Sequence, residues 1–150
     1  MPALTQIMVV EHRVFSTVFD QIEQRLPALQ TLDEVRSLAD LIESRLKRHG
    51  ELEENLSYTA LDHMLAERGQ LQYLYQDHKE IDGRLAKIKT AQGLDQARRL
   101  LAATMIAARK HFRREEEFVF PLLEKVLQRN TLRELADAWI HLKQIPGQFS

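Results

Sequence analysis

Apolar side chains recur three or four residues apart over most of this chain, and this spacing constrains the fold more than any other feature. Near the N-terminus the pattern includes Met8, Phe15, Phe19 and Ile22, which share one face of a helix. Only five Gly and four Pro residues interrupt the chain, and no segment alternates between apolar and polar residues as a half-buried strand would. The sequence therefore predicts an all-α protein.

Breaks in the spacing predict five helices. Four long helices joined by short connections favour an antiparallel up-down-up-down four-helix bundle, to which a short fifth C-terminal helix is added. Pro121, in the fourth helix, is expected to remove one backbone hydrogen bond and to bend that helix. The tail from Ile145 is expected to be irregular. The first predicted helix covers about residues 4–28, and the second begins at 31 or 33 and ends near 69. The third runs from 71 to between 90 and 93, the fourth from there to about 130, and the fifth from 131 to 142.

Composition limits the classes of protein to consider. A chain of 150 residues suits a single domain, here 1–150, with the bundle core over about 5–127. The net charge of -1 predicts no general attraction to nucleic acid or to anionic membranes. No leader and no membrane-spanning stretch is recognisable, so we expect a cytoplasmic protein. Its oligomeric state is left open, with a dimer as one alternative.

The chain has no cysteine, which restricts the chemistry available to it. Disulfides, iron–sulfur clusters, cysteine-ligated zinc and thiol catalysis are excluded. Histidine, aspartate and glutamate remain as metal ligands. Any metal site in this chain is therefore expected to be built from imidazoles and carboxylates.

One motif, His-x3-Glu-Glu-x3-aromatic-x2-Leu, occurs twice in the chain, beginning at His49 and again at His111. Three intervening residues place His49 and Glu53 one helical turn apart on one face, and they place His111 and Glu115 in the same relation. An imidazole and a carboxylate arranged in this way can hold one metal ion.

Histidine also interrupts the apolar face of each of the four long helices, where Leu or Ile would otherwise be expected. Burying ionised carboxylates beside several imidazoles costs several kcal/mol per group unless the charges are compensated, and a cation removes that penalty. Counted from the turn near Gly69, Glu53 lies farther along the second helix than His78 lies along the third, if both helices are straight. The second helix is therefore expected to bend or to end early, near Ala60. The candidate metal ligands are His12, His49, Glu53, His78, His111 and Glu115.

Four imidazoles and two carboxylates suit iron, manganese or zinc better than Cu(I). Carboxylates from facing helices can bridge two ions, so the set predicts two metal ions with an oxo or hydroxo bridge. Six side chains do not saturate two octahedral ions. Positions are therefore expected to stay open for water, dioxygen, peroxide or nitric oxide.

The order His, His-x3-Glu, His, His-x3-Glu, with Phe120–Pro121 after the last motif, resembles the hemerythrin-like (HHE cation-binding) family over about residues 5–127. The resemblance implies a four-helix bundle with a non-haem di-iron centre held by the six candidate ligands. The oxygen-carrying hemerythrins have a further metal-binding histidine where this chain has Leu74, so simple oxygen carriage is not expected. Tyr75 or Tyr73 is a candidate for the vacant coordination position.

Other residues near the motifs have alternative interpretations. Glu116 could replace Glu115 as a ligand, and Glu54 could replace Glu53, although helical phase favours Glu53 and Glu115. Aromatic residues, Phe118 among them, are expected to line the core or a pocket. The remaining interpretations concern surface or loop positions for His63 and His141, a solvated face for the basic run 109–114, and packing of Trp139 on the bundle, with a dimer contact as its alternative.

The leading hypothesis is a di-iron protein that binds, senses or reacts with small oxidants such as oxygen, peroxide or nitric oxide, or that takes part in iron handling. One alternative is a di-iron enzyme with catalase- or peroxidase-like activity. Another is a helical interaction module with a structural metal. The sequence does not separate iron from manganese or zinc, nor a carrier or sensor from an enzyme.

Overall fold

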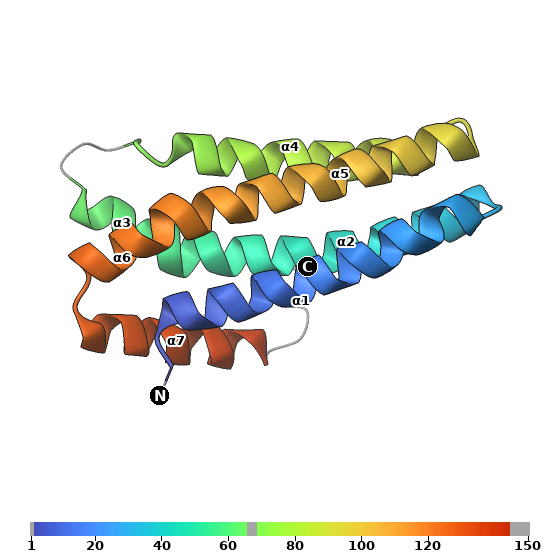
Figure 1. Cartoon of the computed structure of the whole chain (residues 1–150). Helices are drawn as coiled ribbons and strands as arrows, with labels where there is room; N and C mark the ends of the chain where they lie inside the picture. Colours follow the sequence, from blue (N-terminus) through green and yellow to red (C-terminus); the bar gives the residue numbers. More distant parts are fainter. Residues whose placement is uncertain (1, 66–68, 145–150) are drawn as a thin grey trace.

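The computed structural model of the chain describes residues 2–65 and 69–144. These ranges fold into helices and short connections and contain no strand, which confirms the all-α prediction. Figure 1 shows four long helical rods that run alternately in opposite directions, with α7 along one side. None of the helices in the described ranges has the length and apolarity needed to cross a membrane. The tail 145–150, predicted to be irregular, lies outside the described residues.

Two of the four rods are continuous α-helices, apart from a short 3-10 turn, and the other two each contain a π-helix. In chain order the elements are α1 (Leu4–Arg25) with the 3-10 turn η1 (Leu26–Ala28), α2 (Leu32–Leu52) with the π-helix η2 (Glu53–Tyr58) and α3 (Thr59–Met64), α4 (Gln72–Lys89), α5 (Leu94–Arg114) with the π-helix η3 (Glu115–Val119) and α6 (Phe120–Val126), and α7 (Arg129–Lys143).

Thr31 fixes the start of the second rod. Its Oγ1 accepts a hydrogen bond from the backbone N–H of Glu34 at 3.2 Å, and the Glu34 carboxylate accepts one from the backbone N–H of Thr31 at 3.1 Å. This reciprocal capping box satisfies amide groups that have no partner within the helix. Of the two predicted starts of this helix, 31 and 33, the structure therefore selects the earlier, with Thr31 as the N-cap.

The predicted second and fourth helices are interrupted, and both end before the residues at which the spacing placed their ends. The second rod contains a π-helix and ends at Met64, before 69 and close to the early end near Ala60 that the depth count indicated. The fourth ends at Val126 rather than 130. The interruption near Pro121 is a π-helix, which lies directly before the α6 helix that carries this proline in its first turn. This π-helix also changes the helical phase, because Phe118, predicted to face the interior, is 63% exposed, whereas Val119 is buried.

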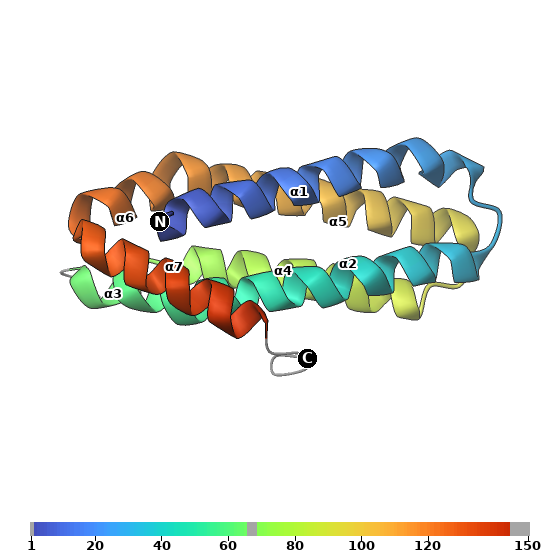
Figure 2. The ribbon, with the colours of Figure 1, turned by 90° about the horizontal axis from the view of Figure 1, so that it is seen from below.

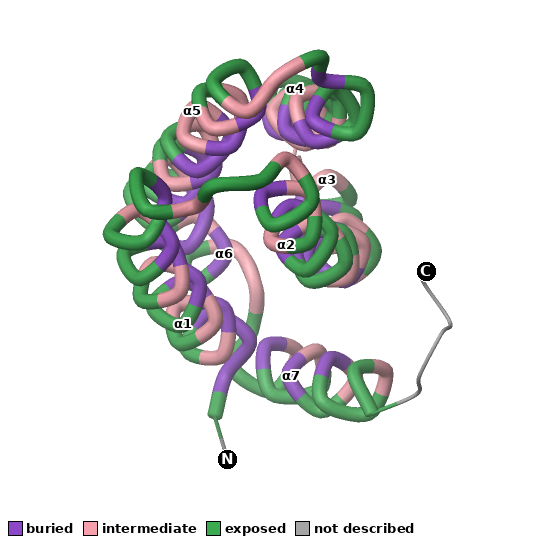
Figure 3. Tube along the Cα trace, turned by 90° about the vertical axis from the view of Figure 1, so that its right-hand side faces the viewer, coloured by how far each residue is buried: buried purple, intermediate pink, exposed green. Residues whose placement is uncertain are grey.

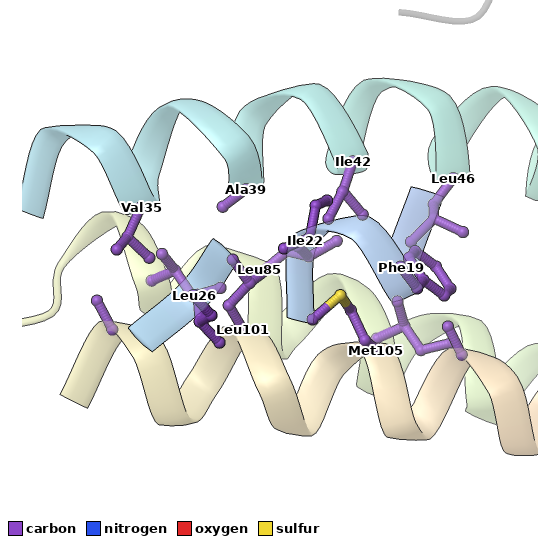
Figure 4. Close-up of a cluster of buried hydrophobic side chains, with 14 of the residues drawn as sticks. Phe19, Ile22, Leu26, Val35, Ala39, Ile42, Leu46, Leu85, Leu101 and Met105 are labelled. Carbon is purple, nitrogen blue, oxygen red and sulfur yellow. The ribbon is translucent and has the colours of Figure 1, made fainter. Parts of the chain in front are cut away.

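Two apolar clusters fill the bundle. One lies toward the η1 end and includes Phe19, Ile42 and Met105, which point into the space between the rods (Figure 4). The other lies toward α3 and α6 and includes Leu74 and Trp139. In Figure 3, buried positions follow the inward sides of the helices. The candidate ligands come between the two clusters along each rod, so a polar layer separates two apolar halves of the core.

The predicted short fifth helix is α7, which packs against α1 and against the α2–η2 rod. Figure 2 shows α7 along the part of these rods farther from η1. Trp139 of α7 is completely buried. The expectation that Trp139 packs on the bundle is therefore confirmed, and the dimer-contact alternative is not needed to explain its burial.

Candidate metal centre

All six predicted ligand residues lie in the polar layer between the apolar clusters. Five of them are at most 3% exposed, and the side chain of the sixth, His78, is 14% exposed. Every rod contributes to the layer. The residues are His12 of α1, His49 of α2 with Glu53 of η2, His78 of α4, and His111 of α5 with Glu115 of η3.

The six residues form two groups in which potential ligand atoms lie within 4.8 Å of one another. Glu53 belongs to both groups, because its Oε2 lies 3.3 Å from His49 Nε2 and its Oε1 lies 3.1 Å from His78 Nε2. A carboxylate with one oxygen in each group is placed as a bridging carboxylate would be. The first ligand group is His12, His49, Glu53 and Glu115, and the second ligand group is Glu53, His78 and His111.

The first ligand group contains buried polar atoms that have no hydrogen-bond partner among the described residues. They are Nε2 of His12, Nε2 of His49, Oε2 of Glu53 and Oε1 of Glu115. An unsatisfied buried polar group costs about 1–3 kcal/mol. One cation at the centre of this group would engage all four atoms, so the donor set fits a metal ion.

The second ligand group also has metal-ligand spacing. Nε2 of His78 lies 2.9 Å from Nε2 of His111, and two neutral imidazoles cannot both present lone pairs to each other without repulsion. Two nitrogens bound to one ion at about 2.1 Å would lie about 3 Å apart at a right-angled coordination geometry. The observed separation therefore suits two ligands of a single cation.

The outward-facing nitrogen of each histidine contacts a second carboxylate. Such outer contacts orient a ligating imidazole and select the tautomer whose other nitrogen faces the metal. Nε2 of His49, His78 and His111 is thereby directed toward the ligand groups, whereas Nδ1 of His12 lies near Glu116 without a hydrogen bond. The Nδ1 contacts are His49 with Glu11 at 2.8 Å, His111 with Asp77 at 3.0 Å, His78 with Glu54 at 3.1 Å, and His12 with Glu116 at 3.5 Å.

This geometry bears on the alternative ligands Glu54 and Glu116. Both are partly exposed and contact the Nδ1 side of a histidine ring, whereas Glu53 and Glu115 are completely buried and face the ligand groups. The positions of the four side chains therefore favour Glu53 and Glu115 as ligands. Glu54 is hydrogen-bonded to Nδ1 of His78 and is placed to orient its ring, whereas Glu116 lies 3.5 Å from Nδ1 of His12 without a hydrogen bond.

Tyr58 is a central residue that sequence reasoning missed as a candidate. Its Oη donates a hydrogen bond to Glu115 Oε2 at 2.7 Å and approaches Glu53 Oε1 at 3.0 Å. The same oxygen lies 3.3 Å from Nε2 of His111, and the side chain is completely buried. The available signal was the aromatic position of the repeated motif, which Phe120 occupies in the second copy.

Tyr73 and Tyr75, the two tyrosines proposed from the sequence as ligands, lie farther than Tyr58 from the candidate ligand groups. Tyr73 is 41% exposed, and the Arg114 guanidinium lies 5.8 Å from its ring centre. Tyr75 packs its ring edge-on against Tyr58, with 5.3 Å between ring centres. Leu74 is buried in the same apolar cluster as Tyr58. Tyr58 therefore places its hydroxyl among the candidate ligands, whereas Tyr75 packs against its ring and Tyr73 lies at the surface beside Arg114.

The π-helices explain how Tyr58 reaches the centre. η2 begins at Glu53, and η3 begins at Glu115. The backbone N–H that follows each π-helix bonds to a carbonyl five residues earlier, as from Phe120 to Glu115. A π-turn places residues five apart on the same side of the helix, so Glu53 and Tyr58 share a face. Short π-helical turns within α-helices occur frequently at functional sites.

Without a cation the layer holds excess protons. The imidazoles around Glu53, His49 foremost, keep its pKa well below the usual value despite a burial that would raise it. Burial, and then the charge of Glu53, raises the pKa of Glu115 well above its usual value. Burial would lower the pKa of His78 and of His111, but neighbouring carboxylates raise the two values to about 10 and about 8. A bound cation could take the place of these protons.

A cavity of about 170 Å³ borders the metal centre and is lined in part by His49, His78 and His111. Gly50 also lines it, and a Cβ at this position would stand 3.5 Å from the His78 ring. That distance is an ordinary van der Waals contact, so a side chain at this position would border the cavity without clashing with His78. A cavity of this size admits a few water-sized molecules, so a diatomic molecule or peroxide can approach the ligand groups.

The remaining sequence interpretations concern residues outside the metal centre. His63 and His141 are both exposed, as expected. Arg109, within the basic run, pairs with Asp20 at 2.5 Å and also with Glu23, and Arg114 pairs with Asp77 at 3.3 Å. Carboxylates compensate these charges, as the solvated-face interpretation predicts.

The comparisons with known proteins agree with this geometry. The family model of the hemerythrin HHE cation binding domain matches the chain in two overlapping segments, residues 3–96 and 71–142. Comparison with curated proteins and with solved structures gives no significant match. The two matched segments together cover all four rods, both His-x3-Glu motifs and α7. The chain therefore belongs to the hemerythrin HHE cation-binding domain family.

Proposed function

We propose that this protein holds two iron ions in the two ligand groups and that the centre binds, senses or reacts with a small oxidant. The observation that carries the proposal is the position of Glu53, which supplies one oxygen to each group. Four imidazoles and two carboxylates are a donor set that iron accepts. Manganese and zinc are the alternatives that metal analysis separates from iron.

Iron supplies redox chemistry and exchangeable coordination positions when it is bound. The protein controls which molecules reach those positions. Phe112 stacks on His12 with 4.1 Å between ring centres, and Phe120 lies on the same ring at 5.4 Å. These apolar rings exclude bulk water from the first ligand group, while the 170 Å³ cavity beside His78 admits small molecules. This combination favours dioxygen, peroxide or nitric oxide as the reacting partner.

Anaerobic loading with Fe(II), followed by exposure to each oxidant, tests the proposal. We expect about two irons per chain by elemental analysis and, after air, the near-ultraviolet absorption of a bridged diferric centre. A protein that binds no iron would contradict the proposal. Iron that stabilises the fold without any optical response to oxygen, peroxide or nitric oxide would instead assign the metal a structural role. The cytoplasmic location inferred from the sequence stays a prediction.

A second candidate function is catalase- or peroxidase-like turnover, and the position of Tyr58 favours it. The hydroxyl of Tyr58 is the one neutral O–H group hydrogen-bonded to both buried carboxylates in the described chain. Peroxide chemistry requires proton movement, and a positioned acid or base contributes about 10²–10⁴-fold to a rate. Tyr58 is therefore placed to relay a proton to or from Glu115.

The substitution Tyr58→Phe tests this second function because it removes the hydroxyl and keeps the ring. We expect peroxide turnover to fall by about 10²-fold or more while two irons stay bound. Tyr75→Phe is the matched control, since its ring packs on Tyr58 without placing the hydroxyl among the ligands. Unchanged turnover in Tyr58→Phe would exclude the relay, and absence of turnover in the unmodified protein would leave binding or sensing as the function.

A further inference from the structure

Trp139, the one tryptophan of the chain, lies beside the first ligand group. Its ring packs edge-on against the imidazole of His49, with 5.4 Å between ring centres, and its side chain is completely buried. A second oxidisable ring, that of Tyr58, stacks on the imidazole of His78 at 5.6 Å. Both side chains are therefore close enough to a metal bound by these imidazoles to exchange an electron with it.

Glu11 joins Trp139 to His49 by hydrogen bonds. Its Oε2 accepts from Nε1 of Trp139 at 2.7 Å, and its Oε1 lies 2.8 Å from Nδ1 of His49. The other nitrogen of the same imidazole, Nε2, lies 3.3 Å from Oε2 of Glu53, inside the first ligand group. An indole, a carboxylate and an imidazole thus form a continuous connection from α7 to the candidate metal ligands.

The charge of Glu11 favours oxidation of Trp139. An indole that loses one electron becomes a cation radical, and a carboxylate hydrogen-bonded to its N–H stabilises that positive charge. Water screens this attraction little, because Trp139 is completely buried and the Glu11 side chain is 12% exposed. Lys143 also donates to Glu11 Oε2, at 2.6 Å, but its side chain is 50% exposed, so its opposing charge is screened more strongly. The Nε1 proton can therefore stay in its hydrogen bond while the electron leaves.

The position of α7 gives electrons a route from outside the protein. Figure 2 shows α7 on the outside of α1 and α2, and Ile140, next to Trp139, is 41% exposed. The outer surface of a helix lies within about 10–12 Å of the side chains on its inner face, a distance that an electron crosses by tunnelling. A reductant at this surface therefore needs no binding pocket, and it stays apart from an oxidant in the 170 Å³ cavity beside His78.

We propose that Trp139 relays single electrons from a small external reductant to the metal centre during peroxide reduction, with Glu11 as the residue that positions and stabilises the oxidised indole. The proposal rests on the di-iron centre proposed above. Trp139 gives up an electron toward His49 and then recovers one from the reductant, and its Nε1 proton does not leave.

The electrons and protons of this reaction balance with ascorbate as the reductant. One hydrogen peroxide takes up two electrons and two protons and becomes two water molecules. Two ascorbate anions each give up one electron and one proton and become ascorbyl radical anions. Trp139 carries the two electrons one after the other, the protons pass through the solvent, and the irons are ferric before and after.

Rapid freezing of the iron-loaded, air-oxidised full chain after mixing with peroxide tests the relay. Without reductant, we expect an electron paramagnetic resonance signal of an indole radical, which belongs to Trp139 because the chain has no other tryptophan. The signal should narrow when the protein contains ring-deuterated tryptophan, and ascorbate should abolish it. A radical that narrows only with deuterated tyrosine and disappears in Tyr58→Phe would overturn the proposal.

Elemental analysis separates failure of the relay from failure of the di-iron proposal. Two bound irons that consume peroxide without forming an indole radical would overturn the relay alone. A chain that binds no iron would contradict the di-iron proposal, and the relay with it.

Two aromatic substitutions provide a matched pair for turnover. Trp139→Phe keeps a ring that peroxide chemistry does not oxidise readily, and it should lower ascorbate-dependent peroxide reduction by about tenfold or more at full iron occupancy. Tyr73→Phe removes an oxidisable ring that is 41% exposed and lies beside Arg114, and it should leave the rate unchanged. Equal rates in both variants would contradict the relay.

The role of Glu11 is tested without iron. In the metal-free protein, Glu11→Gln keeps an oxygen that can accept from Trp139 and removes the negative charge. The reduction potential of the indole radical, measured by protein-film voltammetry, should therefore rise. Lys143→Gln removes the exposed positive charge beside the same carboxylate and should not raise it. An unchanged potential in Glu11→Gln would overturn the assignment of Glu11.

Discussion

The four histidines of the polar layer divide their two ring nitrogens between two tasks. Nε2 faces the candidate ligand groups, and Nδ1 faces a carboxylate such as Glu11 or Asp77. Two consecutive glutamates differ in the same way. Glu53 lies among the candidate ligand groups, whereas Glu54 is hydrogen-bonded to the outer nitrogen, Nδ1, of His78. Residue identity alone does not distinguish these neighbours. Their positions relative to the four rods do.

This contrast gives a prediction for the pair Glu53→Gln and Glu54→Gln. Glu53 supplies an oxygen to each ligand group, so Glu53→Gln should leave at most one iron per chain. Glu54→Gln should keep two irons but weaken their binding by about 10–100-fold, as loss of an outer contact to a ligating imidazole does. Elemental analysis after dialysis against graded chelator measures both. Two tightly bound irons in Glu53→Gln would contradict the bridging position.

At the scale of elements, the π-helices and α7 complete the site. Both π-helices begin at the glutamate of a His-x3-Glu motif, so the backbone widens directly after each candidate carboxylate ligand. α7 contributes from outside the bundle, since Trp139 donates from Nε1 to Glu11 Oε2 at 2.7 Å, and Glu11 Oε1 lies 2.8 Å from His49 Nδ1. The C-terminal helix is thereby connected to the first ligand group through one carboxylate.

The connection predicts the effect of Trp139→Phe, which keeps an aromatic ring and removes the N–H donor. Glu11 is an ionised partner, because its hydrogen bonds to His49, Lys143 and Trp139 outweigh burial and lower its pKa to about 2. Loss of one hydrogen bond to a charged group costs about 1.5–3 kcal/mol. We expect the free energy of unfolding to fall by about this amount, measured by urea titration with circular dichroism.

A double-mutant cycle provides the control for the α7 prediction. In the Glu11→Gln background the N–H of Trp139 no longer has a charged acceptor. Trp139→Phe should then cost less than in the unmodified chain, by about 0.5–3 kcal/mol. Additive losses would show that the contribution of Trp139 is apolar packing alone and that α7 is not coupled to the ligand groups through Glu11.

At the scale of the whole molecule, protons and metal compete for the polar layer. In the metal-free protein, carboxylates raise the pKa of His78 to about 10 and of His111 to about 8, against a desolvation that would lower both values. A raised pKa in the folded state stabilises the fold fully below the unfolded value of about 6.5. That contribution is lost as the pH rises through about 8 and then about 10.

The metal-free protein should therefore lose stability between pH 6.5 and 10, by up to about 1.4 kcal/mol for each unit of pKa shift. Metal binding requires deprotonated imidazoles and carboxylates, so the stability that iron adds should increase over the same range. Unfolding of the metal-free and iron-loaded forms, compared at several pH values, measures the difference. A difference that stays constant with pH would show that the metal does not displace these protons.

The sequence by itself determined the helical class, the alternating bundle and the residues that meet in the polar layer. These features are local, since the apolar spacing defines one face of each helix and three intervening residues align His49 with Glu53. Their order along the chain also carried the family resemblance that the family model bears out. The depth count anticipated that the second helix would bend or end early, near Ala60, and this rod contains a π-helix and ends at Met64. The end of the fourth rod at Val126 was placed too late, and nothing in the spacing indicated the π-helices.

Only the tertiary structure decided how the polar layer is completed. Tyr58 enters it through a π-turn, Glu11 and Asp77 approach the histidines from neighbouring rods, and Glu53 comes to lie between two ligand groups. A cavity of about 440 Å³ between α1 and α2 likewise depends on where α7 ends, because Lys143 contributes to its lining. Each of these features joins residues far apart in the sequence or shifts helical phase by one residue. The packing of the rods therefore fixes them, whereas periodicity along the chain does not.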